Sequence, residues 1–283
     1  MLEVPKRKQR IAVALPATLT LDIPHLREKT ARIGLIARSL AIFRVEEAII
    51  YPDQESDKAR EEGRLFEKIL RFGETPQYLR KHVFKMDPDL RYAGVLPPLR
   101  SPHHPNREEP RPGQFREGVV LSSGANSKVD VGFKDHVSVN ARLEMSRRVT
   151  VRMTRLSPVL EGELVDPSGL HIYWGFMVSR ETRTLGEVMK RGDRDLTVST
   201  SRKGTDIRQV IGKLRDRWKA ARRPLIMFGS PREGIPEILS RSHARTTDVD
   251  FNLNIVPDQG VETIRTEEAL LSTLAVLNMF EEA

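Results

Sequence analysis

The feature that most constrains the fold is an alternation of short apolar runs with longer stretches whose apolar residues recur at helical spacing. Residues 11–15 form one such run, a helical stripe follows through Leu26, Ile33 and Leu40, and residues 48–51 form a second run. Uninterrupted apolar runs of this length are typical of strands covered on both faces, and the order strand, helix, strand is typical of parallel pairing. We therefore expect an α/β protein with a mostly parallel sheet.

The same pattern returns after residue 170. Strands are predicted at residues 172–178, 196–200, 225–228 and 251–256. Helices are predicted at 207–218, from Pro231 onward, and from an N-cap at Thr266. Earlier in the chain, a charged helix is expected over 55–71, followed by a shorter one with Thr75 as N-cap and Pro76 in its first turn. One α/β domain, interrupted by an insert, explains both halves.

The interruption begins where prolines become frequent, between residues 97 and 112, and continues as short alternating segments. Strand, turn and strand are predicted over 119–133, as in a small β-barrel. In the strand predicted at 148–154, alternation places Val149 and Val151 on one face and Arg148 and Arg152 on the other. These two arginines are candidates for RNA binding, and a merely solvated face is the alternative. The predicted domain bounds are 1–88, 89–166 and 167–283.

Composition narrows the classes of partner and chemistry. The chain has 47 Lys and Arg against 39 Asp and Glu, a net charge of +8, which favours a polyanionic partner or else an ion-pair-rich surface. Cysteine is absent, which excludes disulfides and thiolate zinc sites, and His103-His104 lacks the spacing of a metal site. The apolar runs are too short for a membrane span and the basic start lacks a signal-peptide core, so we expect a cytoplasmic protein without membrane or metal.

Candidate ligand-binding residues lie in loops that follow three of the C-terminal strands, at 200–204, 229–234 and 257–263. Ligands of open α/β sheets bind beyond the carboxyl ends of the strands, and glycines allow close approach of the backbone, so these loops suggest a nucleoside cofactor. Taken singly, each is compatible with an ordinary turn. Ile235-Pro236 stands where a P-loop needs its Lys and its Ser or Thr, and no G-x-G-x-x-G follows the first strand. A nucleotide hydrolase and an N-terminal dinucleotide or Rossmann-type methyltransferase site are therefore disfavoured.

The segment 254–269 carries a specific resemblance. Asn254-Ile255-Val256-Pro257, then Gln259-Gly260, then residues 263–269, is similar to the knot loop and following helix of SPOUT-superfamily methyltransferases. Residues 228–234 resemble the preceding cofactor loop of that superfamily, and the β-rich interruption resembles its archaeal and eukaryotic subgroup with an OB-like insert. The resemblance implies a C-terminal trefoil knot, S-adenosylmethionine as cofactor, a homodimer, and structured ribosomal or transfer RNA as substrate.

Loops and resemblance together give a set of cofactor-binding candidates. They are Thr200, Ser201, Gly204, Phe228, Gly229, Ser230, Gly234, Ile255, Pro257, Gln259, Gly260 and Thr263.

Residues 34–39, Gly-Leu-Ile-Ala-Arg-Ser, resemble a helix motif of the ribose-methylating SPOUT branch, in which the arginine lies near the transferred methyl. Arg38 is thus a candidate catalytic residue, and an exposed structural arginine is the alternative. The companion Asn of that motif is missing, since Arg32 stands beside Ile33. An activated methyl donor needs mainly an aligned acceptor that loses its proton, so no catalytic triad is required. The acceptor, an oxygen or a nitrogen, stays open.

A noncatalytic RNA-binding or assembly factor that keeps the same fold is the rival hypothesis. The positive charge and the barrel insert predict it equally well. Binding of S-adenosylmethionine distinguishes the two, because only the enzyme needs the methyl donor.

Overall fold

The structure is a computed structural model that describes residues 3–105 and 109–281. The chain forms two compact units, each built from segments distant in sequence. We call residues 1–6, 72–91 and 98–175 the barrel unit, and residues 7–71, 92–97 and 176–283 the sheet unit. The barrel unit is thus larger than the insert predicted at 89–166, because the chain on both sides of the barrel packs with it.

The sheet unit contains a six-stranded sheet in the order β11-β9-β10-β1-β2-β8, and every neighbouring pair is parallel. The prediction of an α/β protein with a parallel sheet is confirmed. The central strands are apolar and fully buried, as expected for strands covered on both faces. The strands are β1 (Ala12–Pro16), β2 (Glu47–Tyr51), β8 (Met177–Arg180), β9 (Leu196–Asp206), β10 (Pro224–Met227) and β11 (Phe251–Asn254).

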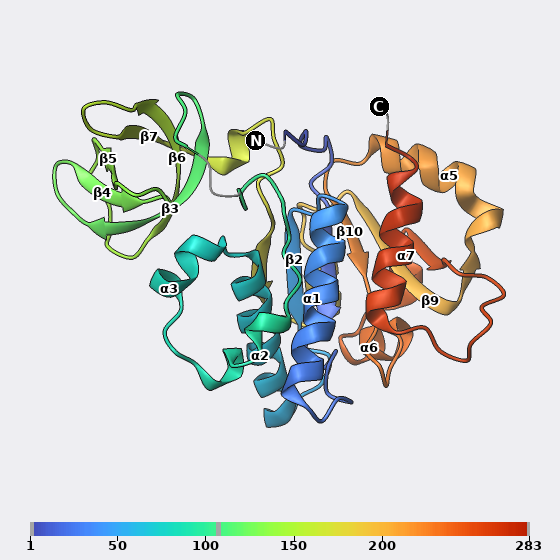
Figure 1. Cartoon of the computed structure of the whole chain (residues 1–283). Helices are drawn as coiled ribbons and strands as arrows, with labels where there is room; N and C mark the ends of the chain where they lie inside the picture. Colours follow the sequence, from blue (N-terminus) through green and yellow to red (C-terminus); the bar gives the residue numbers. More distant parts are fainter. Residues whose placement is uncertain (1–2, 106–108, 282–283) are drawn as a thin grey trace. The chain divides into compact units, whose positions relative to one another are not determined.

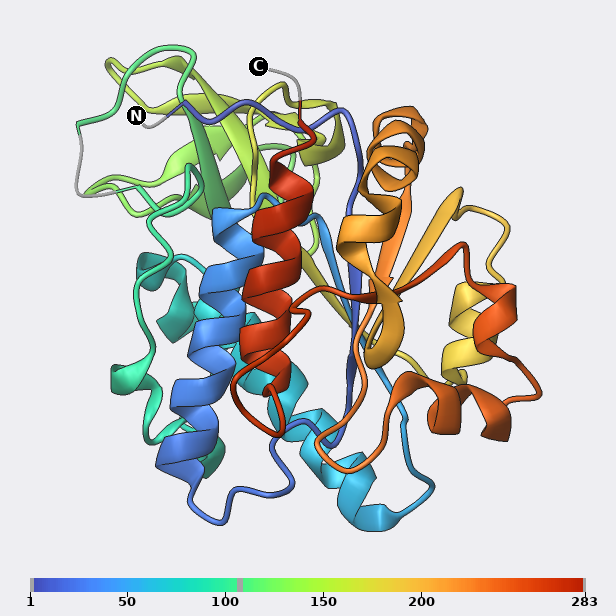
Figure 2. The ribbon, with the colours of Figure 1, turned by 90° about the vertical axis from the view of Figure 1, so that its right-hand side faces the viewer.

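Helices cover both faces of this sheet. Side chains of α4 and α6 share a buried cluster with Ala12, Ala14 and Tyr51, so these helices pack on one face. The helices α1 and α7 lie side by side (Figures 1 and 2). The α-helices with residues in this unit are α1 (Leu26–Ile42), α2 (Asp57–Glu74, whose last three residues belong to the barrel unit), α4 (Leu185–Met189), α5 (Ile207–Ala220), α6 (Ile235–Arg241) and α7 (Thr266–Asn278); short 3-10 turns are η3 (Ala93–Val95) and η5 (Thr246–Asp248).

The barrel unit contains a closed five-stranded barrel in the order β3-β4-β5-β7-β6. Its pairings are antiparallel except for β5 with β7, which is parallel. Val149, Val151 and Met153 point into the apolar core, which confirms the predicted alternation of β6. The elements are β3 (Phe115–Ser122), β4 (Ser127–Asp130), β5 (Val137–Val139), β6 (Arg148–Arg155), β7 (Glu161–Val165), α3 (Arg80–Val83), η1 (Gln77–Leu79), η2 (Pro88–Leu90) and η4 (Pro167–Gly169).

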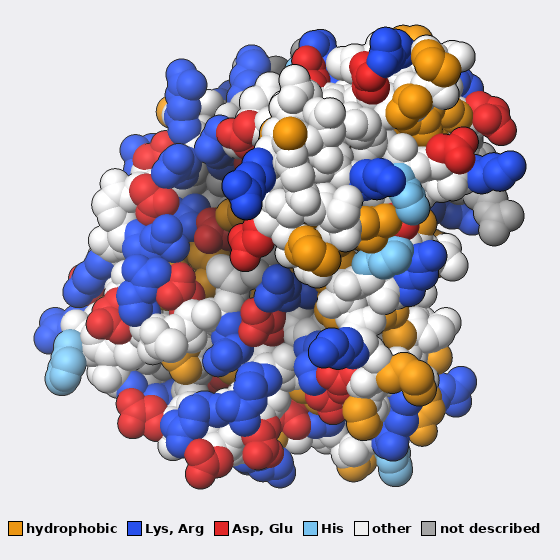
Figure 3. Space-filling view, turned by 90° about the vertical axis from the view of Figure 1, so that its left-hand side faces the viewer, with side chains coloured by type: hydrophobic (Ala, Val, Ile, Leu, Met, Phe, Trp, Pro, Cys, Tyr) orange, Lys and Arg blue, Asp and Glu red, His pale blue; other side chains and the backbone are white. Residues whose placement is uncertain are grey.

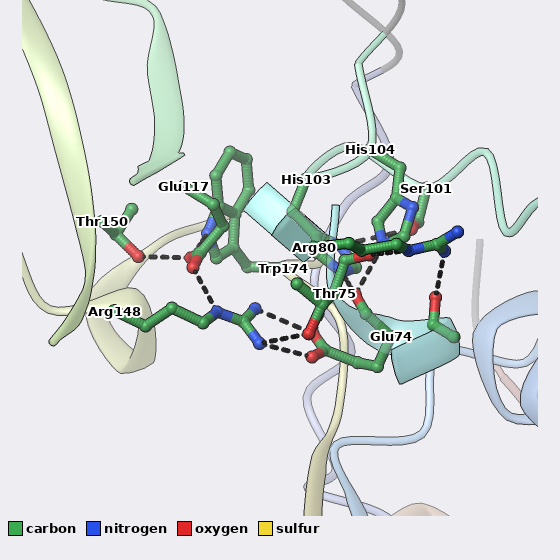
Figure 4. Close-up of polar contacts among 11 residues, drawn as sticks. Glu74, Thr75, Arg80, Ser101, His103, His104, Glu117, Arg148, Thr150 and Trp174 are labelled. Atoms are coloured by element: carbon green, nitrogen blue, oxygen red, sulfur yellow. Dashed lines mark hydrogen bonds and ion pairs between the residues drawn. The ribbon is translucent and has the colours of Figure 1, made fainter. Parts of the chain in front are cut away.

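A buried ionic cluster within the barrel unit is centred on Glu74, the last residue of α2 (Figure 4). The Glu74 carboxylate accepts from Arg148 Nη1 at 2.8 Å and lies 3.1 Å from His103 Nε2. Arg148 Nε also donates to Glu117, whose carboxylate accepts from Trp174 Nε1 at 2.6 Å. Burial alone would raise the pKa of the Glu74 carboxyl, but Arg148 and His103 hold it well below its usual range. Glu74 is therefore ionised, and the guanidinium of Arg148 balances its negative charge.

The same cluster satisfies the backbone carbonyls at the end of α2. Both His103 and His104 contact the Glu74 carbonyl oxygen through Nε2, and Arg80 donates to the carbonyls of Gly73 and Thr75. The last carbonyls of a helix have no partner within it, and cationic or imidazole side chains are suitable donors. Burial and the neighbouring His103 lower the pKa of His104 to about 3, so this ring is neutral at pH 7.

Several predicted element boundaries are wrong. Thr75 caps no helix, because its hydroxyl accepts from Arg148 at 3.3 Å. The helix expected from Pro231 begins at Ile235 instead, with Pro236 in its first turn. The last helix has Arg265 as N-cap, and Thr266 instead donates to the Gly229 carbonyl at 3.2 Å. In each case a tertiary contact, or a second proline, moves the boundary.

The strand predicted at 172–178 starts only at Met177. Residues 172–175 belong to the barrel unit, where Ile172 forms an isolated bridge with Pro5. Gly175 has a φ of +85°, and a Cβ there would lie 2.5 Å from His103 Cε1. The left-handed conformation, which favours glycine, thus occurs at the last residue of the barrel unit, and the sheet unit resumes at Phe176.

We expect Glu74→Gln to lower the free energy of unfolding by about 3 kcal/mol, because it removes the buried carboxylate that pairs with both Arg148 and His103. Urea unfolding followed by circular dichroism measures this. Glu163→Gln is the matched control, since Glu163 pairs with Arg152 where both side chains are about half exposed, and it should cost less than about 1 kcal/mol. Equal losses for the two variants would contradict the role given to Glu74.

Candidate active site

A cavity of about 610 Å³ lies in the sheet unit, a size typical of small-molecule sites. Its walls come from β9, from the loops after β10 and β11, and from the start of α7. Because all strands run parallel, the carboxyl ends of these three meet at the same edge of the sheet. Charged side chains of both signs line the cavity: Arg32, Arg202, Lys203, Arg232 and Arg265 together with Asp22, Glu233, Glu237 and Glu262.

The first wall is an excursion within β9 rather than a loop after it. Ser199 pairs with Asn252, but the next residue of β11, Leu253, pairs with Thr205. Residues 200–204 are therefore extra and bulge away from the ladder. A Cβ at Gly204 would lie 2.6 Å from the backbone of Leu253, so only glycine allows the two backbones to approach so closely at the point where pairing resumes.

The second wall is the loop that joins β10 to α6. It closes as a tight turn, in which the Ser230 N–H donates to the Glu233 carbonyl at 2.9 Å and the Glu233 N–H donates to Ser230 Oγ at 3.1 Å. A hydrogen bond from Arg241 lowers the pKa of Glu233 and fixes this side chain. A Cβ at Gly229 would lie 2.9 Å from the Glu233 carbonyl oxygen, so the turn requires glycine at this position.

The third wall is the segment between β11 and α7. Arg202 Nη1 donates to the Glu262 carbonyl at 2.6 Å, and Asn254 Nδ2 donates to the Arg202 carbonyl at 3.1 Å, so this wall is tied to the β9 excursion. Thr273, on α7, also lines the cavity, and its Oγ1 is buried without a hydrogen-bond partner among the described residues. A buried hydroxyl without a partner on a cavity wall is suited to a ligand.

The structure brings most of the predicted cofactor residues together around this one cavity. The lining residues among them are Thr200, Ser201, Phe228, Gly229, Ser230, Gly234, Ile255, Gln259 and Thr263. Gly204, Pro257 and Gly260 do not line it. Gly204 instead serves backbone packing, and a Cβ at Gly260 would meet nothing within 4 Å. Cofactor binding by all of these residues stays a prediction.

Two residues that the sequence did not single out, Asp22 and Arg32, also line the cavity. Asp22 lies in the loop after β1, and Arg32 projects from α1. Arg38 is not in the lining; six residues later on the same helix, it points about 120° away from Arg32. The one sequence signal for Arg32 was its position beside Ile33, where the ribose-methylating branch would have the companion Asn of the motif that contains Arg38. A catalytic role of Arg38 stays a prediction.

The two predicted RNA-binding arginines lie on β6 in different surroundings. Arg148 is held by Glu74 and Glu117 in the ionic cluster, whereas Arg152 pairs with Glu163 on the exposed face. Sequence reasoning missed Arg116, whose buried guanidinium donates twice to the Val131 carbonyl and stacks on Phe133. It is part of the barrel's packing.

Across residues 3–105 and 109–281, no group of three or more His, Asp or Glu side chains is arranged to hold a metal ion. Within the same residues, no helix combines the length and the apolar character that crossing a bilayer demands.

Comparison with known proteins gives a consistent result. Residues 10–277 match the family described as "Putative RNA methyltransferase". An uncharacterized protein of Halobacterium salinarum is 33% identical, with 95% of this chain and 99% of that protein covered. Two relatives are named 28S rRNA (uridine-N(3))-methyltransferase. The one from Drosophila melanogaster is 34% identical, and the match covers 93% of this chain and 62% of the relative. The one from Homo sapiens is 32% identical, and the match covers 96% of this chain and 78% of the relative.

We expect Gly229→Ala to weaken binding of the expected cofactor, S-adenosylmethionine, by about tenfold or more, equivalent to at least about 1.4 kcal/mol. The added Cβ must displace the Glu233 backbone and open the turn. Isothermal titration calorimetry measures the dissociation constant. Gly212→Ala, on α5 and outside the cavity lining, is the control and should bind normally, because the new methyl group meets open space. A cofactor affinity that Gly229→Ala leaves unchanged would rule out this turn as a binding wall.

Proposed function

Because the chain belongs to this family of RNA methyltransferases, and is therefore an enzyme, we propose that it transfers a methyl group from S-adenosylmethionine to N3 of a uridine in ribosomal RNA. The cavity at the ends of β9, β10 and β11 is the observation that carries the proposal. The acceptor follows from relatives 32–34% identical to the chain, which are named as uridine-N3 methyltransferases of 28S rRNA.

The cavity residues fit S-adenosylmethionine on three counts. The ligand carries a carboxylate, an ammonium and a sulfonium, and the lining offers charges of both signs. The Gly229 backbone provides a surface that a Cβ would disturb, and the Thr273 hydroxyl is buried and without a partner among the described residues. When bound, S-adenosylmethionine supplies an activated methyl group, and the chain's residues have to hold and orient the acceptor.

The resemblance to SPOUT proteins supports assigning a trefoil knot to the C-terminal chain. In this arrangement the segments 200–204, 228–234 and 254–263 are the cofactor loops. Their mutual hydrogen bonds, such as that from Arg202 to the Glu262 carbonyl, hold the walls in place before any ligand arrives. A preorganised site binds its ligand at lower entropic cost.

The barrel supports RNA binding as an OB-like domain. Its strand order, with a single parallel pairing between β5 and β7, is that expected of a five-stranded Greek-key barrel of this type. Arg152 is half exposed, and its pair with Glu163 is weak enough to be exchanged for a phosphate contact. On the face shown in Figure 3, Lys and Arg are interspersed with Asp and Glu. On this face, positive charge is thus mixed with negative charge rather than gathered in one basic patch.

The proposed methylation predicts that deleting the gene removes N3-methyluridine from one position of large-subunit ribosomal RNA. Nucleoside mass spectrometry detects the loss, and re-expression of the wild-type chain should restore the modification. Calorimetry with S-adenosylmethionine, with and without RNA, tests the cofactor. A chain that binds RNA but no S-adenosylmethionine would support the noncatalytic RNA-binding factor instead.

A homodimer is supported by an apolar surface on the neighbouring helices α1 and α7. Leu35 and Ile42 are two turns apart on α1 and are 56% and 51% exposed. Leu271 on α7 and Met279, the residue directly after this helix, are 45% and 77% exposed. Apolar side chains gathered on two adjacent helices are typical of an interface between copies. Arg38 lies on α1 between Leu35 and Ile42 and would be near this interface.

Light scattering should therefore give twice the chain mass of 32.2 kDa for the wild type. Leu271→Asp should reduce the measured mass to that of one chain, because a carboxylate would be buried without a partner. Met145→Asp, at a 61% exposed apolar position of the barrel unit, should leave the dimer intact. A monomeric wild type would refute the dimer.

A further inference from the structure

Asp22 and Arg32 are set apart from the rest of the cavity wall by their origin. Every other lining residue comes from β9 or β11, from the loops after β10 and β11, or from the helices α6 and α7. Asp22 follows β1, and Arg32 lies on α1. These two charged residues thus contribute a separate wall, which the cofactor loops do not provide.

The two side chains lie next to each other in a defined arrangement. Arg32 Nη1 is 3.3 Å from Asp22 Oδ1, and Arg32 Nε is 3.1 Å from Glu267 Oε1 on α7. The Arg32 side chain is only 12% exposed, so these contacts and its packing hold it in place. Asp22 is 43% exposed and can exchange protons with water. Arg32 Nη2 has no hydrogen-bond partner among the described residues.

A guanidinium beside a carboxylate offers hydrogen-bond donors next to acceptors. The Watson–Crick edge of uracil has the complementary pattern, with the N3–H donor flanked by two carbonyl acceptors. Enzymes that modify a base read the extruded base through this edge. Cytosine has an acceptor at N3, which would face the carboxylate with like polarity, so the pair also discriminates against cytidine.

Resting on the proposed uridine-N3 methylation, we infer that the Asp22–Arg32 pair binds the target uracil and removes its N3 proton. Arg32 donates to a uracil carbonyl oxygen, and the Asp22 carboxylate accepts the N3 proton. The negative charge left on N3 and the carbonyl oxygens is stabilised by the guanidinium. N3 then forms its bond to the methyl carbon while the bond from that carbon to sulfur breaks, with its electron pair going to sulfur. Asp22 releases the proton to water.

A purely structural ion pair between the β1 loop and α1 is the competing explanation. An aspartate that is 43% exposed contributes little to stability through such a pair. Glu267 provides the more buried contact to Arg32, and it is a positioning residue in this scheme. The structural explanation assigns no role to the chemistry of N3, which makes the two explanations separable by changing the acidity of the substrate.

The experiment compares Asp22→Asn with the wild type on transcripts of the mapped ribosomal RNA segment, which contain either uridine or 5-fluorouridine. Fluorine makes the N3–H more acidic, so a substrate of this kind depends less on a protein base. On uridine RNA we expect kcat to fall by about 100-fold or more. On 5-fluorouridine RNA the loss should be about tenfold smaller, while the dissociation constant for S-adenosylmethionine changes by less than about twofold. Asp57→Asn, at a surface Asp–Arg pair on α2, is the matched control and should keep full activity.

Two results would overturn the inference. The first is an unchanged kcat in Asp22→Asn on uridine RNA, and the second is an equal loss on both RNAs, as a structural role predicts. A wild-type chain that produces no N3-methyluridine would refute the proposed function as well, and this outcome is distinct because it appears before any variant is measured.

Discussion

Parallel pairing of the strands is the constraint on which the candidate site depends. Because β9, β10 and β11 all run in the same direction, their carboxyl ends meet at one edge of the sheet, although the segments that follow them are far apart in sequence. The loop after β1 reaches the same edge and contributes Asp22. An antiparallel neighbour would have sent one of these segments to the opposite edge and left the cavity without a wall.

Backbone geometry, more than side-chain chemistry, shapes the cofactor side of the cavity. Hydrogen bonds to main-chain carbonyls join the β9 excursion to the end of β11 and the segment after it, and they join the start of α7 to Gly229. Glycines occupy the points of closest approach, at Gly204 against Leu253 and at Gly229 against Glu233. The opposite holds in the barrel unit, where histidine and arginine side chains satisfy the carbonyls that end α2. Because the cluster is buried, removing one of its charged partners is expected to destabilise the folded chain.

The order of elements was largely predictable from sequence, and their ends were not. Apolar runs such as residues 11–15 and the stripe through Ile33 and Leu40 follow from local periodicity, which survives in the folded chain as β1 and α1. Thr75 and Thr266 were misplaced as helix N-caps, because a side chain that can cap a helix can equally bond elsewhere. Thr75 accepts from Arg148, and Thr266 donates to Gly229. Such competition is invisible in a local window.

The sequence by itself determined the α/β class, the β-rich interruption and the glycine-containing segments near the C-terminus, because these features depend on neighbours within a few residues. Tertiary structure alone decided which of those residues share a cavity: Ser230 and Gln259 line it, whereas Gly260 does not. It also selected Arg32 over Arg38 on the same helix, since helical rotation separates their directions. The partners of Arg32 lie ten residues back and on the last helix, and the tertiary fold brings them together around its guanidinium.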